Sequence, residues 1–271
     1  MSTRNIVVFA IAATGLATAP AALAYPGGTP AYQTDAAPFC AACHSSTAES
    51  DLAGAPAERA SKELAANKHL ALIRAGAAGS GYESLSQADR DALAAAVRAV
   101  DEASTVKLEA PERVKAGETF KVTVRITGGD GPVSGVALVD GNQRWFARPA
   151  PAAGWLVAAP PEIKGPDGKL QTEWLSRRPE SLGRDLSYVN VTGIQGDAAK
   201  GKWSSAEIVF TLRAPQQKGS HPLAAAYLYG TEMASPIGVV TDALGQKGPR
   251  GGMGGHSGRV RFSPVAQISV Q

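Results

Sequence analysis

The sequence predicts a small helical domain followed by a larger all-β domain, an α + β multidomain chain. Three observations lead to this prediction. Helix-forming, Ala-rich sequence extends to about residue 104, and apolar and polar residues alternate from there to the C-terminus. The 30 Gly and 18 Pro residues are typical of frequent turns. The expected domains are 25–104 and 105–271, after an N-terminal segment that covers residues 1–24.

Residues 1–24 predict a cleaved signal peptide. One positive charge, Arg4, precedes an uncharged apolar run that ends in Ala22-Leu23-Ala24, with small residues where a signal peptidase needs them. A membrane anchor is the alternative, but the run is short and Pro20 interrupts it. No later stretch is long enough to span a bilayer. We therefore expect an exported, periplasmic protein without a membrane span in the mature chain.

Two helices are predicted in the first domain, over about 53–75 and 84–103. Each has an apolar stripe at helical spacing, and Ser86 with Asp89 predicts a capping box at the start of the second helix. The stripes consist of Leu64, Leu72 and Ile73 in the first helix and of Leu93, Val97 and Val100 in the second.

Seven alternating runs predict the strands of the second domain. They lie in 105–129 (two runs), 132–140, 186–194, 205–215, 222–230 and 258–270. Short strands at this spacing favour an immunoglobulin-like β-sandwich. Because this part of the chain has no cysteine, its core must provide the stability, and we expect Trp145, Trp155, Trp174 and Trp203 to supply much of it.

Both cysteines of the chain, Cys40 and Cys43, lie directly before His44. In covalent haem attachment two thiols at this spacing add to the two vinyl groups, and the following His becomes an axial iron ligand. A disulfide across so short a loop would constrain little of the unfolded chain. The helical domain is also poor in large apolar side chains, with Phe39 as its one Phe, and a haem would fill its core.

Three other interpretations of the motif stay open. A thioredoxin-like dithiol needs a strand before the cysteines, and residues 25–39 do not predict one. A zinc site formed by Cys40, Cys43, His44 and His69 has four ligands, but the adjacent Cys43 and His44 fit one tetrahedron poorly. The third is chance.

On these residues, 25–104 resembles a class I c-type cytochrome reduced to its minimum, with CxxCH near the start and "SLSQADRDALAAAVRAV" similar to the closing helix. The resemblance implies one haem c and a second axial ligand in the middle of the domain. That ligand is usually Met, but Met1, Met233 and Met253 all lie outside the mature helical domain. His69 is therefore our candidate, and an open site or a ligand from the β domain are the alternatives. Two imidazole ligands predict a low-spin, low-potential haem.

The β domain resembles the immunoglobulin-like domains of reeler type that accompany haem modules in exported bacterial proteins. The residues that carry this resemblance are "WSSAEIVFTLRAP" and "PLAAAYLYG", and they imply no functional residue. We expect His221 to make hydrogen bonds at the start of a strand. Met253 and His256 lie in the Gly-rich segment 245–258, which predicts a flexible surface loop; a cover over the haem edge or a copper site is the alternative.

The remaining sequence narrows the function. A formal net charge of +3 without clusters of Lys and Arg argues against a nucleic-acid partner. No GxSxG, Walker-type loop or HExxH motif is present, so we predict an electron carrier and not an enzyme. The expected function is that of an exported monohaem c-type cytochrome in periplasmic electron transfer, with another redox protein as partner. The alternative is a haem-based sensor or binding protein whose β-sandwich recognises a partner or ligand.

Overall fold

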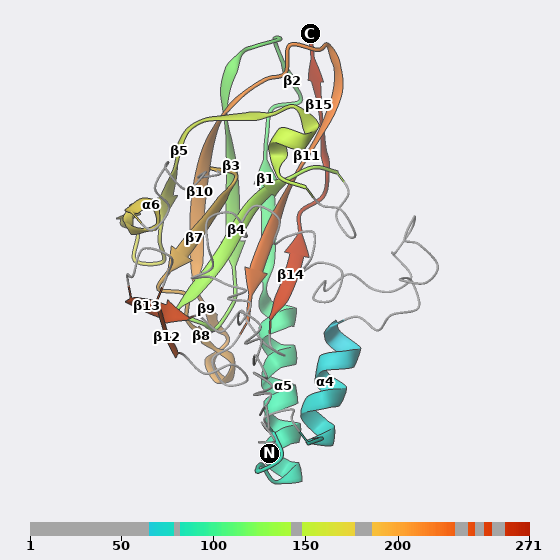
Figure 1. Ribbon diagram of the computed structural model, residues 1–271, viewed down its shortest axis with the longest axis vertical. Coiled ribbons are helices and arrows are strands. Elements are labelled where there is room, and N and C mark those ends of the chain that lie inside the picture. The colour runs from blue at the N-terminus through green and yellow to red at the C-terminus, as the bar shows by residue number, and fades with distance from the viewer. Residues whose placement is uncertain are drawn as a thin grey trace, which may run out of the picture.

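The computed structural model describes residues 65–78, 82–141, 148–176, 186–230, 238–241, 247–250 and 258–271, and it gives the backbone alone at 65–69, 238–241 and 247–250. Its main body consists of two β-sheets, and two α-helices extend from one end of that body (Figure 1). The helices are α4 (Ala65–Ala75), α5 (Gln87–Ala103) and the single turn α6 (Glu173–Ser176).

The first sheet has five antiparallel strands in the order β1-β3-β10-β5-β6. Burial alternates along β3 and β10, so one face of this sheet points into the core and the other toward solvent. The strands are β1 (Thr105–Glu109), β3 (Thr119–Thr127), β10 (Ser205–Arg213), β5 (Leu156–Lys164) and β6 (Leu170–Gln171).

The second sheet has six strands, in the order β2-β15-β11-β4-β7, and β14 also pairs with β11. Strand β11 is long enough to pair with β15 through its first half and with β14 through its second half. All seven residues of β4 are buried. The strands are β2 (Arg113–Val114), β15 (Ala266–Val270), β11 (Gly219–Tyr229), β4 (Val133–Val139), β7 (Tyr188–Thr192) and β14 (Arg259–Phe262).

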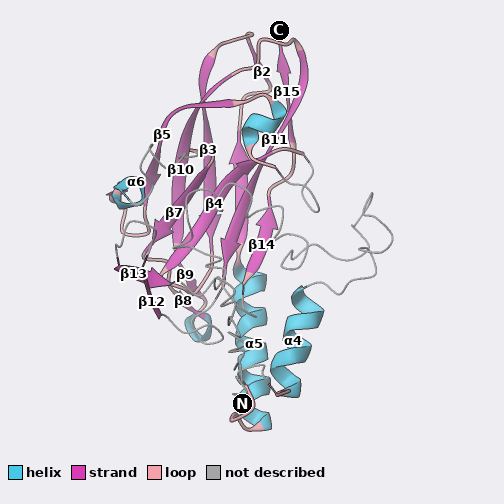
Figure 2. Cartoon of the chain, viewed as in Figure 1, coloured by secondary structure: helices cyan, strands magenta, loops and turns pink. Residues whose placement is uncertain are grey.

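Two short antiparallel pairs complete the strands that the structure describes (Figure 2). One joins β8 (Gly196–Asp197) to β9 (Lys202–Trp203), and the other joins β12 (Gly238–Thr241) to β13 (Lys247–Arg250). Two 3-10 turns, η2 (Ala150–Ala153) and η4 (Ala198–Lys200), lie in the connections between strands.

Apolar side chains from both sheets form one continuous core. Trp155 just before β5, Phe210 of β10 and Tyr227 of β11 are among its largest fully buried members. Because the same cluster holds residues of β3 and β10 from one sheet and of β4, β7 and β11 from the other, the two sheets form a β-sandwich.

The helices α4 and α5 pack against each other through a second, much smaller cluster. The side chain of Ser86 accepts a hydrogen bond from the Asp89 backbone N–H at 3.2 Å, which confirms the predicted cap of α5. The buried members of the cluster are Leu70, Ile73, Tyr82, Leu93, Ala94 and Val97. None of the helices in the described part of the chain has the length and apolar character needed to cross a membrane.

The C-terminal end of α5 belongs to the sandwich. Val100 is buried in the large core cluster with the strands, not in the cluster between the helices. Ser104 alone separates α5 from β1, and its hydroxyl donates to the Val100 carbonyl at 2.7 Å and accepts from the Gly129 N–H at 3.0 Å. The helix therefore enters the sheet without a linker.

The prediction of a small all-α, cytochrome c-like domain is wrong, and so is the resemblance to a minimal class I c-type cytochrome fused to a reeler-type domain. The described chain is predominantly β, and α4 and α5 are its only helices longer than one turn. The physical reason is that the cluster between α4 and α5 is small, and the end of α5 contributes Val100 to the sandwich core. The part of the fold-class prediction that the structure supports is a β-sandwich.

The seven predicted runs all lie in strands, and the last one is divided between β14 and β15. Sequence reasoning missed β5, which contains Pro160 and Pro161. The pairing of β5 with β10 shifts between Glu162 opposite Val209 and Ala159 opposite Thr211, so that both prolines lie opposite the single residue Phe210. This bulge accommodates two residues that cannot donate ladder hydrogen bonds. Of the four tryptophans, Trp155 and Trp174 are buried, Trp203 packs against the core, and Trp145 lies outside the described residues.

Candidate functional site

The residues of the predicted haem site lie mostly outside the described part of the chain. The structure does not describe Cys40, Cys43 and His44. It also does not describe the segment 251–257, which contains Met253 and His256, the residues of the alternative copper site or haem cover. His69 is a residue of α4 and lies one helical turn before Ile73. Among the residues whose side chains the structure does describe, no three His, Cys, Asp or Glu side chains form a group suited to a metal ion.

His221 joins two connections at one end of the sandwich. Its Nδ1 lies 3.1 Å from the carbonyl oxygen of Ala153 in η2, and its Nε2 lies 2.9 Å from that of Gln217 in the turn before β11. The ring also packs edge-on against Trp155, with 5.8 Å between ring centroids. These contacts confirm that His221 makes hydrogen bonds at the start of a strand. An imidazolium donates to both carbonyls, whereas a neutral imidazole donates to one.

A polar cluster joins α5 to the second sheet. The carboxylate of Asp101 in α5 accepts a hydrogen bond from the Tyr229 hydroxyl of β11. Arg261 of β14 donates to the Asp101 carbonyl at 2.8 Å, and its guanidinium lies 3.5 Å from the Asp101 carboxylate. Burial opposes the charge of Arg261, but its interactions with Tyr229 and Asp101 outweigh burial and raise its pKa. This cluster fixes the end of the helix to the sheet.

Two further groups of the cluster are buried more deeply. Burial lowers the pKa of Arg259, although the charge of Asp101 acts to raise it. The Arg259 guanidinium donates a hydrogen bond to the Gly258 carbonyl at 2.9 Å. Burial strongly raises the pKa of Tyr227, whose hydroxyl donates to the Gly128 carbonyl at 2.9 Å. The rings of Tyr227 and Tyr229 lie 4.9 Å apart. The described residues thus place charged and phenolic groups where the helices join the sandwich.

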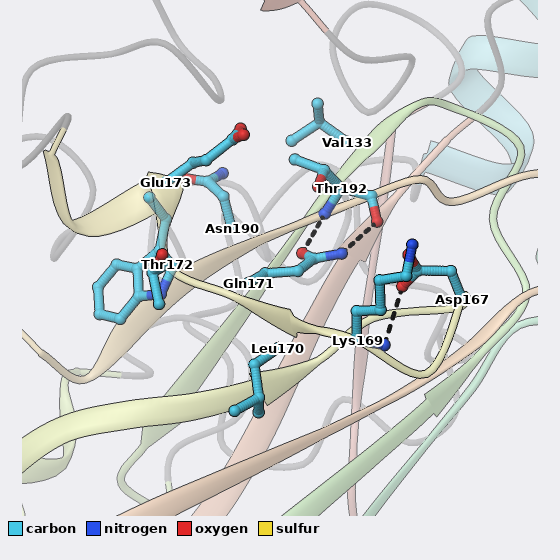
Figure 3. Close-up of a pocket in the computed structure, with 10 residues that line it drawn as sticks. Val133, Asp167, Lys169, Leu170, Gln171, Thr172, Glu173, Asn190 and Thr192 are labelled. Carbon is cyan, nitrogen blue, oxygen red and sulfur yellow. Dashed lines mark hydrogen bonds and ion pairs between the residues drawn. The ribbon is translucent and has the colours of Figure 1, made fainter.

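A separate hollow opens where the edges of the two sheets meet (Figure 3). It has a volume of about 300 Å³. Strand β6 is the last strand of the first sheet, and β7 is the last strand of the second sheet. Both contribute lining residues, as do the turn before β6 and the start of α6. The hollow is therefore shaped by strands that are fixed in separate sheets.

Gln171 of β6 bridges the two sheets at this hollow. Its side-chain nitrogen donates to the Thr192 carbonyl at 3.0 Å, and its side-chain oxygen accepts from the Thr192 N–H at 2.9 Å (Figure 3). The amide thereby satisfies both backbone groups of Thr192 in the edge strand β7, as a neighbouring strand would. This double hydrogen bond holds the two walls of the hollow at a fixed spacing.

The other polar lining residues lie on both sides of Gln171. Thr172, Glu173 and Asn190 lie on one side of it and Asp167 and Lys169 on the other (Figure 3). The ammonium of Lys169 is 3.7 Å from the Asp167 carboxylate, and the Lys169 N–H donates to that carboxylate at 3.0 Å. The apolar lining consists of Val133, Leu170 and Trp174.

Sequence reasoning did not find this hollow. The segment "GPDGKLQTEW" has a Pro-Asp-Gly signal, which predicts a turn between two strands, and the structure places this turn between β5 and β6. The turn residues have the composition of any solvated turn, and the opposite wall is contributed by residues near 133 and 190. The sequence alone holds no signal that brings these segments together.

Comparisons with known proteins give no family for this chain. Neither the protein-family models nor the curated proteins that were compared with it match.

Proposed function

We propose that this protein is an exported electron-transfer protein with one covalently attached haem c. The observation that carries the proposal is the spacing of Cys40 and Cys43 with His44 directly behind them. The thiols of Cys40 and Cys43 would hold the haem through thioether bonds, and the imidazole of His44 would bind its iron. A haem held by these residues would supply one-electron redox chemistry.

Export supports the proposal because covalent haem attachment in bacteria takes place outside the cytoplasm. Residues 1–24 have the charge, apolar run and small-residue end of a signal peptide. The partner we propose is another periplasmic redox protein. The chain's formal net charge of +3 is too small for a strongly charged partner to be selected by overall electrostatic attraction.

His69 is the distal ligand that we propose. It follows His44 by 25 positions (69 − 44) and lies in α4, which packs against α5. Since α5 is joined to the sandwich through Asp101 and Ser104, a ligand carried by α4 would have a defined place relative to the β-sheets. Two imidazole ligands favour low-spin iron with a lower potential than a His and Met pair.

The proposal is tested on the full chain produced in a bacterium that can attach haem c. The pyridine haemochrome spectrum of the exported protein should be of the thioether type and should be lost in Cys40→Ala and Cys43→Ala. Leu156→Ala, which changes an exposed side chain far along the chain, is the control and should keep the spectrum. A native protein without haem would overturn the proposal.

The distal ligand has a separate test. His69→Ala should convert a low-spin spectrum into a high-spin one that shifts with added CO. An unchanged spectrum would show that His69 is not the ligand. A native protein that already binds CO tightly would favour the second candidate function, a sensor or binding protein, for which the hollow in the sandwich is the structural argument.

A further inference from the structure

We propose that the hollow between β6 and β7 binds a small neutral saccharide. This ligand site is independent of the haem and goes beyond the proposed electron transfer. Three observations support the saccharide site: the place of the hollow, the kinds of group that line it and the charges of the lining residues.

The place and size of the hollow are those of a small-molecule site. Its volume of about 300 Å³ is at the lower end of the range found for ligand pockets. A site of this size suits one or two sugar rings. The walls are preorganised because β6 and β7 are held in separate sheets and the two hydrogen bonds between Gln171 and Thr192 fix their spacing.

The chemistry of the lining matches a ligand that carries many hydroxyl groups. Carboxylates of Asp167 and Glu173 accept hydrogen bonds, and the Asn190 amide and the Thr172 hydroxyl both donate and accept. Each sugar hydroxyl also donates and accepts, so such a mixed wall can bind neighbouring hydroxyls in turn. The exposed side chain of Leu170 supplies apolar surface for the C–H faces of the ring.

The charge of the lining argues for a neutral ligand. Two carboxylates and one ammonium face the hollow, and that ammonium, on Lys169, forms an ion pair with Asp167 at 3.7 Å. The one cation among the lining residues is therefore already paired with a carboxylate, and an anionic ligand such as phosphate would find no other cation in this lining. A hydroxyl-rich neutral ligand needs no cation and uses the carboxylates as acceptors.

The test is a calorimetric titration of the full-length protein with glucose, galactose, N-acetylglucosamine and maltose, run beside inorganic phosphate and spermidine. We expect saturable binding of at least one sugar and none of phosphate or spermidine. Asn190→Ala should weaken that binding by about tenfold, the loss typical of an interaction worth 1.4 kcal/mol. Lys121→Gln, on the outer face of the first sheet, is the matched control and should bind as the native protein does.

A second variant guards against misfolding. Glu173→Gln removes a charge from an exposed residue of the one-turn helix α6, and it should weaken sugar binding while the far-UV circular dichroism spectrum stays that of the folded protein. Saturable binding of phosphate or spermidine without any sugar would overturn the proposal. So would sugar binding that neither Asn190→Ala nor Glu173→Gln alters. Because calorimetry reports sugar binding independently of haem attachment and electron transfer, a failure here is distinguishable from a failure of the proposed electron transfer.

Discussion

The hydroxyl of Tyr229 donates a hydrogen bond to the carboxylate of Asp101, although the two residues lie 128 positions apart in the sequence. Arg261 of β14 completes the cluster by donating to the Asp101 carbonyl. Helix α5 is thus joined to two strands of the second sheet, and through α5 the helical hairpin has a defined position on the sandwich.

Replacing Asp101 should destabilise the fold. Asp101→Ala leaves the Tyr229 hydroxyl and the Arg261 guanidinium without this acceptor in a half-buried place, and we expect a loss of about 2 kcal/mol in the free energy of unfolding. Urea unfolding measures this loss. Asp91→Asn on the same helix is the control, since its ion pair with Arg74 is exposed and should be worth less than about 0.5 kcal/mol. Equal effects of the two variants would contradict the role of the cluster.

Burial of Tyr227 predicts a loss of stability at alkaline pH. The pKa of Tyr227 is raised in the folded protein, so the unfolded chain releases its proton first, near pH 10, while the folded chain keeps it. The contribution is complete below pH 10 and falls as the pH rises above it, by about 1.4 kcal/mol per pH unit. Tyr82, whose pKa burial also raises, acts in the same direction.

Urea unfolding between pH 9 and pH 11.5 tests this prediction. Tyr227→Phe removes the titrating group and should reduce the slope of stability against pH above 10 by about one proton, while lowering stability slightly at neutral pH through the lost hydrogen bond. If the variant and the native protein have the same slope, Tyr227 titrates alike in both states and the prediction is wrong.

Trp155 is expected to be among the largest single contributors to the sandwich core. Its side chain is 0% exposed, its indole N–H donates to the Pro222 carbonyl at 2.9 Å, and the Phe120 ring packs against it edge-on. Trp155→Ala should cost about 4 kcal/mol of stability, because it leaves a cavity and an unsatisfied carbonyl. The neighbouring Leu156, which is 50% exposed, is the control, and Leu156→Ala should cost less than about 0.5 kcal/mol. Thermal or urea unfolding of the two variants compares them directly.

Gln171 is expected to stabilise the meeting edges of the two sheets. Gln171→Ala removes both hydrogen bonds to Thr192, and we expect a loss of about 2 kcal/mol, roughly 1 kcal/mol for each bond. Hydrogen exchange at the Thr192 N–H should accelerate in the variant, which is a local measure of the same change. Gln87→Ala, an exposed residue at the start of α5, should leave that exchange rate as it is.

The secondary structure was largely predictable from the sequence where one local rule decides it. Alternation of apolar and polar residues predicted β3 and β10, and the Ser86 cap predicted the start of α5. The sequence did not predict β5, because Pro160 and Pro161 are unusual in a strand. The bulge opposite Phe210 accommodates both residues.

The tertiary relationships were not predictable, because they depend on residues far apart in the sequence. Asp101 finds its partners 128 and 160 positions away, so nothing near it in the sequence indicates that the end of α5 belongs to the sandwich. The hollow likewise combines a turn near 167 with residues near 133 and 190. The haem motif is the opposite case, since its whole chemical argument lies in Cys40, Cys43 and His44.

The central proposal is the covalent attachment of one haem, and intact mass spectrometry of the exported full-length protein tests it most directly. We expect a chain that begins at Tyr25 and carries the added mass of one haem, which persists after denaturation and acidic solvent extraction. A chain at its unmodified mass, produced in cells that attach haem c to other proteins, would show that no haem is attached and that the proposed function is wrong.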